Sequence, residues 1–201
     1  MRLERYKNFL SLEECYILNS WVDEGVEKKW LDLGITRGKN HSEREWNYTK
    51  RVTSRLYGER FEYPQIVLDI SKRIRSFCGI NNYGLIEGHG RDGVVVSCTF
   101  NGGDVYAHKD PKSETFVKLS ALRCNILTRK PSGGGQLYVD GQHVDIEVGE
   151  LHCYLASNFE HYVTEVKGET SRVLWMFGAY VPPEDWENGT IKINLLPNQN
   201  K

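Results

Sequence analysis

The sequence lacks an excess of charge of either sign. Its 201 residues include 26 lysines and arginines against 27 aspartates and glutamates, which gives a formal net charge of −1. Proteins that hold nucleic acid usually present a basic face, and this composition supplies no general attraction of that kind. We therefore expect no nucleic-acid partner, and we expect no nucleic-acid dealkylase.

Long apolar runs are also missing. No stretch approaches the ~18 apolar residues that a membrane helix requires. The N-terminal sequence MRLERYKNFLSLEEC carries charges where the apolar region of a secretory signal would lie. We therefore expect a cytoplasmic protein with no membrane partner.

Paired cysteines are absent as well. The chain has five cysteines, an odd number, and no two of them form a CxxC pair. This pattern favours reduced, mostly buried thiols in a cytosolic protein over a disulfide framework. The five are Cys15, Cys78, Cys98, Cys124 and Cys153.

The composition is that of a globular domain. Hydrophobic residues make up 39% of the chain, enough to bury one core, and there are no repeats or low-complexity segments. We expect a single domain over residues 1–201. It divides into an N-terminal part with helices (1–90), a β-rich core (91–183) and a polar C-terminal tail (184–201).

Two helices are predicted in the N-terminal part. Ser11 and Glu14 form a capping-box pattern before an apolar periodicity that runs to about Gly25. Pro64 suits the first turn of a second helix, because its fixed φ fits there. Apolar residues then recur at helical spacing up to Phe77, and Gly79 is a suitable stop. Between these helices, residues 31–36 could form a short strand, and the sequence VTSRLYG predicts extended structure.

From residue 82 the sequence changes in character, and short β-rich runs alternate with turn signals up to residue 181. Eight such runs are typical of a sandwich or jelly roll and not of a parallel α/β sheet. We predict a mainly β protein with flanking helices around a double-stranded β-helix, a jelly-roll or cupin-like core. The eight runs are GVVVSCTF, VYAHKD, KLSALRCNILT, QLYV, QHVDIEV, LHCYLAS, HYVTEV and SRVLWMFGAYV.

One of these runs carries two potential metal ligands. His108 and Asp110 are two residues apart in extended chain, so their side chains point to the same face. Four or five strands later, far enough to go round a small jelly roll, lies His161. Two imidazoles and one carboxylate form the facial triad that leaves open positions on ferrous iron.

An arginine at the start of an apolar run follows the three predicted ligands. Arg172 begins the apolar run SRVLWMFGAYV, where a guanidinium is costly unless it meets an anion. Its planar fork suits a carboxylate, so it could hold the far end of a small diacid that chelates the metal. Taken alone, His108 would be interpreted as a polar surface or core histidine, and Arg172 as part of a structural ion pair.

A second His-x-Asp sequence, His143-Val144-Asp145, is interpreted as one face of an exposed hairpin strand. The histidines that follow it are too near in sequence for a passage around a barrel. His41, His89 and His152 have no partners at ligand spacing, and we assign them no function.

The predicted ligands and the segments around them resemble the iron(II)- and 2-oxoglutarate-dependent dioxygenases, in particular the prolyl 4-hydroxylase-like branch. The similarity covers most of the chain, through NFLSLEEC, KRVTS, the SGGGQLYV turn and strand, and the run from VDIEVGELHCYL into SRVLWM. Two differences are present. Arg172 stands where many prolyl hydroxylases have lysine, and Thr99 stands where a tyrosine is frequent, so a peptidyl-proline substrate is not implied.

The resemblance implies roles for these residues. His108, Asp110 and His161 would bind Fe(II), which also takes 2-oxoglutarate and O₂, and ascorbate could serve as reductant. Arg172, Thr99 and Asn125 would bind 2-oxoglutarate. Arg123 could bind a substrate carboxylate or phosphate if its face is inward, although an outward position on a sheet edge is an equal alternative. Other substrate-binding candidates are Tyr106, Arg51, Thr53 and Arg55, with Tyr48 in the same possible lid, which could equally be a solvated loop.

The implied activity is hydroxylation of an unactivated C–H bond with release of succinate and CO₂. An intact Asp110 argues against halogenation, whereas desaturation and cyclisation stay open. We expect a small polar substrate such as a free amino acid or a related metabolite. The alternatives are a cupin-type isomerase or lyase that uses the same triad without a keto acid, and a metal-free jelly-roll module that only binds a ligand. The sequence does not indicate an oligomeric state.

Overall fold

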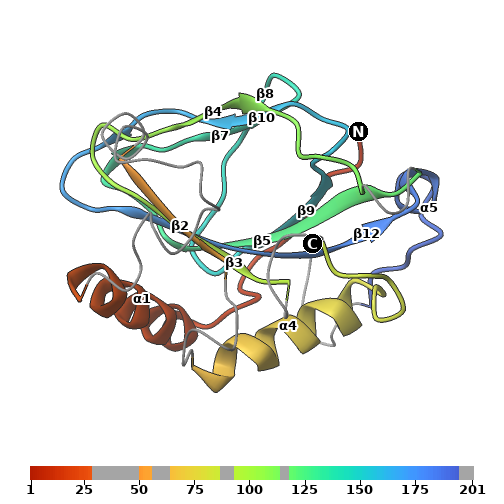
Figure 1. The fold of residues 1–201 in the computed structure, drawn as a ribbon, viewed down its shortest axis with the longest axis horizontal. Helices are drawn as coiled ribbons and strands as arrows, with labels where there is room; N and C mark the ends of the chain where they lie inside the picture. The colour runs from red at the N-terminus through yellow and green to blue at the C-terminus, as the bar shows by residue number, and fades with distance from the viewer. Residues whose placement is uncertain (29–49, 56–63, 87–92, 114–117, 195–201) are drawn as a thin grey trace.

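The structure is a computed structural model that describes residues 1–28, 50–55, 64–86, 93–113 and 118–194. Two antiparallel sheets lie face to face, and two helices cover the outer face of the larger sheet (Figure 1). This is a mainly β jelly-roll core with flanking helices, as the sequence predicts. None of the described helices has the length and apolar character needed to cross a membrane.

The larger sheet has six strands in the order β1-β9-β5-β12-β3-β2. Their bounds are Glu4–Tyr6 (β1), Leu151–Leu155 (β9), Ser120–Arg129 (β5), Arg172–Val181 (β12), Val95–Thr99 (β3) and Arg51–Arg55 (β2).

The smaller sheet has four strands in the order β4-β10-β7-β8, and β11 and β6 form a separate two-stranded ribbon. Their bounds are Val105–His108 (β4), His161–Val163 (β10), Leu137–Val139 (β7), Gln142–Val144 (β8), Val166–Lys167 (β11) and Gly133–Gly134 (β6).

The first helix, α1 (Leu12–Glu27), begins at the predicted capping box. The Ser11 hydroxyl accepts from the Glu14 amide at 3.1 Å, and the Glu14 carboxylate accepts from the Ser11 amide at 2.8 Å. These bonds satisfy two of the backbone donors that a helix start leaves free. Its apolar face, which includes Leu18 and Trp21, is buried against the larger sheet, where the Trp21 ring lies 5.8 Å from that of Trp175.

The second helix, α4 (Gln65–Phe77), begins directly after Pro64 and ends at Cys78, followed by Gly79 at φ +65°. It buries Val67, Ile70, Ile74 and Phe77. Both helices close one core with the outer face of the larger sheet, so the apolar periodicities read from the sequence correspond to real helix faces.

Side chains along the strands of the larger sheet point alternately to the helix-covered core and to the smaller sheet. On β12, Val173, Trp175 and Phe177 belong to the core under the helices, whereas Arg172, Leu174 and Met176 face the smaller sheet. Because side chains of a strand alternate between faces, one sheet supplies a helix-covered core and a polar wall at the same time.

Each of the eight predicted β-rich runs contains a strand, and VTSRLYG contains part of β2. The strand β1, the ribbon β11-β6 and the short helix α5 (Pro183–Glu187) were not anticipated. The strand β1 precedes α1, whereas β2 lies between the helices, where the sequence predicts extended structure. The possible strand at 31–36 lies outside the described residues.

Candidate active site

The two predicted histidine ligands are neighbours across two strands. His108 ends β4 and His161 begins β10, and the antiparallel register places them directly opposite each other. Their ring centroids lie 4.4 Å apart. The return of the chain to the first ligand strand, expected from the number of intervening strands, therefore occurs at this residue pair.

Both imidazoles are oriented by the same kind of hydrogen bond. His108 Nδ1 lies 2.8 Å from the carbonyl oxygen of Tyr106, and His161 Nδ1 lies 3.2 Å from that of Phe159. A carbonyl only accepts, so Nδ1 carries the proton in each ring and leaves Nε2 as a free donor atom for a metal. Burial lowers the pKa of His161 to about 4, which keeps this ring neutral at pH 7.

Asp110 completes the group with one of its two oxygens. Its Oδ1 lies 3.6 Å from His108 Nε2 and 3.9 Å from His161 Nε2, while its Oδ2 accepts from Arg123 Nε at 2.5 Å. Burial alone would raise the pKa of Asp110, but Arg123 and His108 outweigh it and hold this pKa well below its usual range. The backbone amide of Asp110 donates to Ala156 at 2.9 Å, which anchors the ligand beside β9.

Two Nε2 atoms and one carboxylate oxygen thus lie within 4.8 Å of one another. Neutral imidazoles and an ionised carboxylate are the donors that ferrous iron takes in a facial triad with open positions. The donor set and its hydrogen-bonded support fit this ion.

These three residues open into a cavity of about 170 Å³ between the two sheets. One wall comes from inward-facing residues of the larger sheet and the other from apolar residues of the smaller sheet. The lining residues are Arg51, Val95, Ser97, Val105, His108, Asp110, Arg123, Asn125, Leu137, His152, Tyr154, His161, Val163, Arg172, Leu174 and Met176.

Arg172 lies in this cavity with a buried, unbalanced charge. Only 3% of the residue is exposed, and within the described part of the chain it has no hydrogen bond or ion pair. Burial and the neighbouring Arg51 lower the pKa of Arg172 from its ordinary 12.5 to about 10. The guanidinium is therefore charged at neutral pH, and the described residues around it supply no anion to compensate it.

The short segment between β6 and β7 lies against the stem of Arg172. Gly135 has φ +63°, and a Cβ atom there would lie 3.2 Å from Arg172 Cδ and 2.7 Å from Pro131 Cγ. Glycine is therefore required both for the backbone conformation and for the close approach to the arginine. The SGGG sequence matters to the site through this contact.

Further polar atoms at this wall are left without partners. Among the described residues, Asn125 Oδ1, Thr99 Oγ1 and both ring nitrogens of His152 are buried and make no hydrogen bond. Thr99 lies directly opposite Arg172 in the β3–β12 ladder, although it is not one of the described cavity-lining residues. Buried polar groups are nearly always paired, so this cluster indicates a polar ligand.

The sequence interpretation of His152 as functionally unremarkable needs correction. His152 lies directly opposite Asn125 in the β5–β9 ladder, is fully buried and lines the cavity. Burial, together with Arg172 and Arg5, lowers its pKa to about 3, so the ring is neutral. Tyr154, two residues further along β9, faces the same side, and its ring centroid lies 5.4 Å from that of His161. The alternation in LHCYL could have suggested both residues.

Of the predicted substrate-binding residues whose side chains the structure describes, Arg123 and Arg51 line the cavity and Tyr106 does not. Arg123 is buried on the central strand β5, facing inward to Asp110 and not outward on an edge. Arg51 lines the cavity and donates to Ser97 Oγ at 2.7 Å. Tyr106 is 66% exposed and is not one of the described lining residues.

The side chains of the remaining candidates lie outside the described residues. The backbone of Thr53 and Arg55 is in β2, but their side chains lie outside the described part of the structure. Tyr48, His41 and His89 lie wholly outside it. The second His-x-Asp sequence is exposed, as expected: His143 lies beside Tyr138, and Asp145 pairs with Lys130 at 3.2 Å.

Comparisons with known proteins identify the fold. No family profile matches the chain, and no curated protein matches its sequence. Among solved structures, the fold is similar to a viral collagen prolyl hydroxylase from Paramecium bursaria Chlorella virus-1 in complex with 2-oxoglutarate. That match has a TM-score of 0.60 and 16% identity, and it covers 90% of this chain and 97% of the viral protein.

Two other solved structures are similar at 15% identity. A prolyl-4-hydroxylase from Pseudomonas putida has a TM-score of 0.63, with 89% of this chain and 92% of that protein covered. A prolyl hydroxylase from Trichoplax adhaerens, in complex with a hypoxia-inducible-factor peptide fragment, has a TM-score of 0.62, with 88% and 83% covered. The resemblance read from the sequence is thus confirmed at the level of the fold, which is that of prolyl 4-hydroxylases.

Proposed function

We propose that this chain, which has the fold of the prolyl 4-hydroxylases, is an iron(II)- and 2-oxoglutarate-dependent dioxygenase. The observation that carries the proposal is Arg172: a buried guanidinium, for which the described part of the chain supplies no anion, lies in the same cavity as a two-histidine, one-carboxylate group. A dicarboxylic keto acid would satisfy both features at once, because one end reaches the metal and the other meets the arginine.

Each residue then has a defined task. His108 Nε2, His161 Nε2 and Asp110 Oδ1 hold the iron, and Arg123 keeps Asp110 in place through Oδ2. Arg172 binds the distal carboxylate of 2-oxoglutarate, and Asn125, His152 and Thr99 offer hydrogen bonds to the rest of that molecule. The apolar side chains of Leu137, Val163 and Leu174 limit the access of water.

When bound, iron supplies the activation of O₂ and the oxidative decarboxylation of 2-oxoglutarate to succinate and CO₂, coupled to hydroxylation of a substrate C–H bond. For the substrate we propose a small polar molecule such as a free amino acid or related metabolite. The support is the polar pair Arg51 and Ser97 at the cavity, together with the departures from the prolyl hydroxylase pattern noted in the sequence.

The decisive test is spectroscopic. Protein prepared without oxygen is mixed with Fe(II) and then with 2-oxoglutarate. We expect a visible charge-transfer band in the wild type, no band in the double variant His108→Ala/His161→Ala, and a band only at much higher keto-acid concentration in Arg172→Met. A wild type that binds iron but shows no band would refute the proposal.

The same variants separate the two alternatives. A cupin-type isomerase or lyase would turn over without O₂ and would tolerate Arg172→Met. A metal-free binding module would show the same metal content in the wild type and in the double histidine variant. Either result would replace the dioxygenase assignment.

Substrate class is tested by mass spectrometry. The wild type is incubated with Fe(II), 2-oxoglutarate, ascorbate and a panel of amino acids, related metabolites and proline-containing peptides. We expect a small polar compound to gain one oxygen atom with equimolar succinate. Oxidation of the peptides alone would contradict the small-substrate proposal while leaving the dioxygenase assignment intact.

A further inference from the structure

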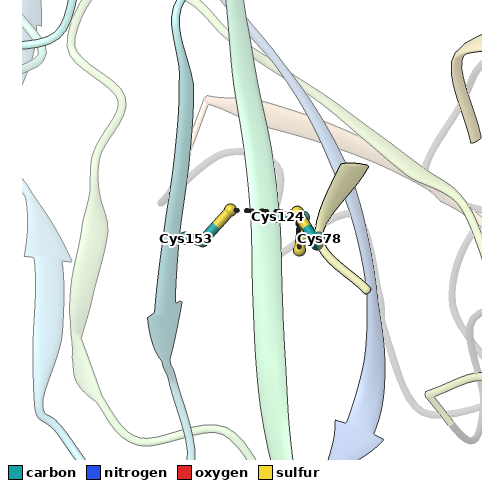
Figure 2. Close-up of side chains that lie close together, drawn as sticks. All are labelled: Cys78, Cys124 and Cys153. Carbon is teal, nitrogen blue, oxygen red and sulfur yellow. Dashed lines mark hydrogen bonds between the residues drawn. The ribbon is translucent and has the colours of Figure 1, made fainter. Parts of the chain in front are cut away.

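Three cysteines that are far apart in sequence meet inside the core. Cys124 on β5 and Cys153 on β9 are directly opposite in the antiparallel ladder, so both thiols emerge on the same face. Cys78 caps the C-terminal end of α4, the helix that covers this face (Figure 1). Figure 2 shows the three thiols close together. The Sγ atom of Cys78 lies 3.8 Å from that of Cys153 and 3.9 Å from that of Cys124.

This cluster is separate from the candidate active site. Cys124 lies between Arg123 and Asn125, and both of those neighbours face the cavity. Because side chains alternate along a strand, the cysteine points to the opposite face of the sheet. Cys153 is placed in the same way on β9, between two cavity-lining residues. The three thiols therefore form a second, fully buried site behind the wall of the first.

The sulfur spacing suits a shared ion. All three Sγ atoms lie within 4.8 Å of one another. Metal–sulfur bonds of about 2.3 Å would place three sulfurs roughly 3.8 to 4.0 Å apart in tetrahedral or trigonal geometry. The two pairs that include Cys78 already have this spacing. A disulfide would instead require sulfurs about 2.05 Å apart and would leave the third thiol unpaired.

The charges around the cluster favour a thiolate. Hydrogen bonds with Cys153 and Cys78 lower the pKa of Cys124. The hydrogen bond with Cys124 raises the pKa of Cys78, and burial raises the pKa of Cys153. The Arg75 guanidinium acts electrostatically on Cys124, and within the described residues its buried Nη1 atom has no hydrogen-bond partner. A positive group near buried thiols reduces the cost of negative charge there.

We propose that Cys78, Cys124 and Cys153 bind one soft metal ion, and that Cu(I) is the ion that fits best. Zn(II) normally takes four ligands in a structural site. Among the described residues the group has three ligand atoms and no fourth His, Cys, Asp or Glu, and the surrounding core is apolar. Cu(I) is selected by thiolates and does not need a fourth ligand.

Binding is an exchange of protons for metal. As copper–sulfur bonds form, the thiol protons leave to the solvent, and copper enters and stays as Cu(I), so no electrons are transferred. The proposal stands independently of the dioxygenase assignment, because no cluster residue lines the cavity.

The first test measures copper retention by the full chain. Cu(I) alone is added without oxygen to the double variant His108→Ala/His161→Ala, which removes the imidazole ligands, and the protein is passed over a desalting column with a competing Cu(I) chelator. We expect about one copper per chain. Adding Cys124→Ala should lower the apparent affinity at least ~10-fold, and Cys78→Ala or Cys153→Ala should act alike.

Matched controls are two other buried cysteines that stand outside the cluster. Cys15→Ala and Cys98→Ala each remove a buried thiol and should leave copper retention unchanged. Loss of copper from the Cys15→Ala and Cys98→Ala proteins, or equal retention with and without Cys124, would overturn the proposal. Zn(II) retained as strongly as Cu(I) would overturn the choice of ion.

The second test needs no cysteine variant and so does not depend on how those variants fold. X-ray absorption at the copper edge of the Cu(I)-loaded double histidine variant should show a shell of sulfur atoms only. Nitrogen or oxygen neighbours in that shell, or no copper bound at all, would mean that the three thiols are ordinary core residues.

Discussion

Replacing Arg172 with methionine should have opposite effects on the stability of the free protein and on cosubstrate binding. The guanidinium is buried beside Arg51 and has no ion pair among the described residues. Its pKa falls from 12.5 to about 10. A shift of this size corresponds to a cost of about 3 kcal/mol for keeping the charge in the folded protein at neutral pH.

Methionine removes that cost and fills much of the same space with a flexible apolar chain. Imperfect packing of the methionine side chain should reduce this gain in stability by about 1 kcal/mol. We therefore expect Arg172→Met to stabilise the ligand-free protein by about 2 kcal/mol. For a chain of this length the melting temperature should rise by roughly 4–8 °C.

Cosubstrate binding should change in the other direction. Truncating one partner of a buried charge pair typically costs about 2–5 kcal/mol, which is a loss of roughly 30-fold to several thousand-fold in affinity. Calorimetric titration of 2-oxoglutarate in the presence of Mn(II), which avoids turnover, measures this loss. Melting curves with and without 2-oxoglutarate give a second readout, because the ligand should stabilise only the wild type.

The matched control is Arg129→Met. Arg129 is on the same strand as Asn125 but pairs at the surface with Asp23 at 2.6 Å. Its loss should cost about 0.2–1 kcal/mol and leave 2-oxoglutarate binding unchanged. Two results would refute the reasoning. One is a ligand-free Arg172→Met protein that is less stable than the wild type, as expected after the loss of a buried ion pair. The other is an Arg172→Met protein that binds 2-oxoglutarate as tightly as the wild type.

Four smaller predictions follow from individual contacts. Arg123→Met leaves Asp110 Oδ2 without its partner, so Mn(II) affinity in a titration should fall about 10- to 100-fold, and an unchanged affinity would contradict the positioning role. His152 is neutral in the fold at a pKa of about 3 but titrates near 6.5 when unfolded; the unfolded state therefore binds more protons as pH falls, and stability drops through this window. In urea unfolding of the metal-free protein, His152→Leu should lose about 2 kcal/mol less than the wild type between pH 7 and pH 5, and equal losses would contradict the buried neutral ring. Gly135→Ala, which crowds the stem of Arg172, should raise the KM for 2-oxoglutarate more than it lowers kcat; the opposite pattern would mean that the contact does not position the arginine. Ser11→Ala removes the helix cap and should cost about 1 kcal/mol in urea unfolding, with no effect on 2-oxoglutarate binding.

The sequence was sufficient where local patterns decide the structure. The apolar spacing of α1 and α4, the capping box at Ser11 and the alternation of the β-rich runs depend on neighbours within a few residues. His108 and Asp110 could be paired from their spacing alone. His161 required one further assumption, that the chain returns to its first ligand strand, and the register of β4 and β10 bears this out.

The sequence was insufficient where strand register decides which residues meet. His152 looked isolated because its neighbours in the cavity wall, Asn125 and Arg172, are on other strands, and only the β5–β9 and β5–β12 ladders bring these strands together. The inward position of Arg123 depends on β5 being central in its sheet. The cluster of Cys78, Cys124 and Cys153 combines a helix end with two strands, a meeting that no spacing rule anticipates.

The short strand β1 has a consequence for handling the protein. It pairs with β9 along one side of the larger sheet, and Arg5 forms an ion pair with the buried carboxylate of Glu150 next to that strand. Trimming the first six residues would leave unpaired the backbone groups of β9 that face β1, while β9 stays paired with β5, and would remove the cation that pairs with Glu150. An unprotected strand of this kind recruits strands from other molecules, so shortened preparations should self-associate long before the helices or the ligand residues are disturbed.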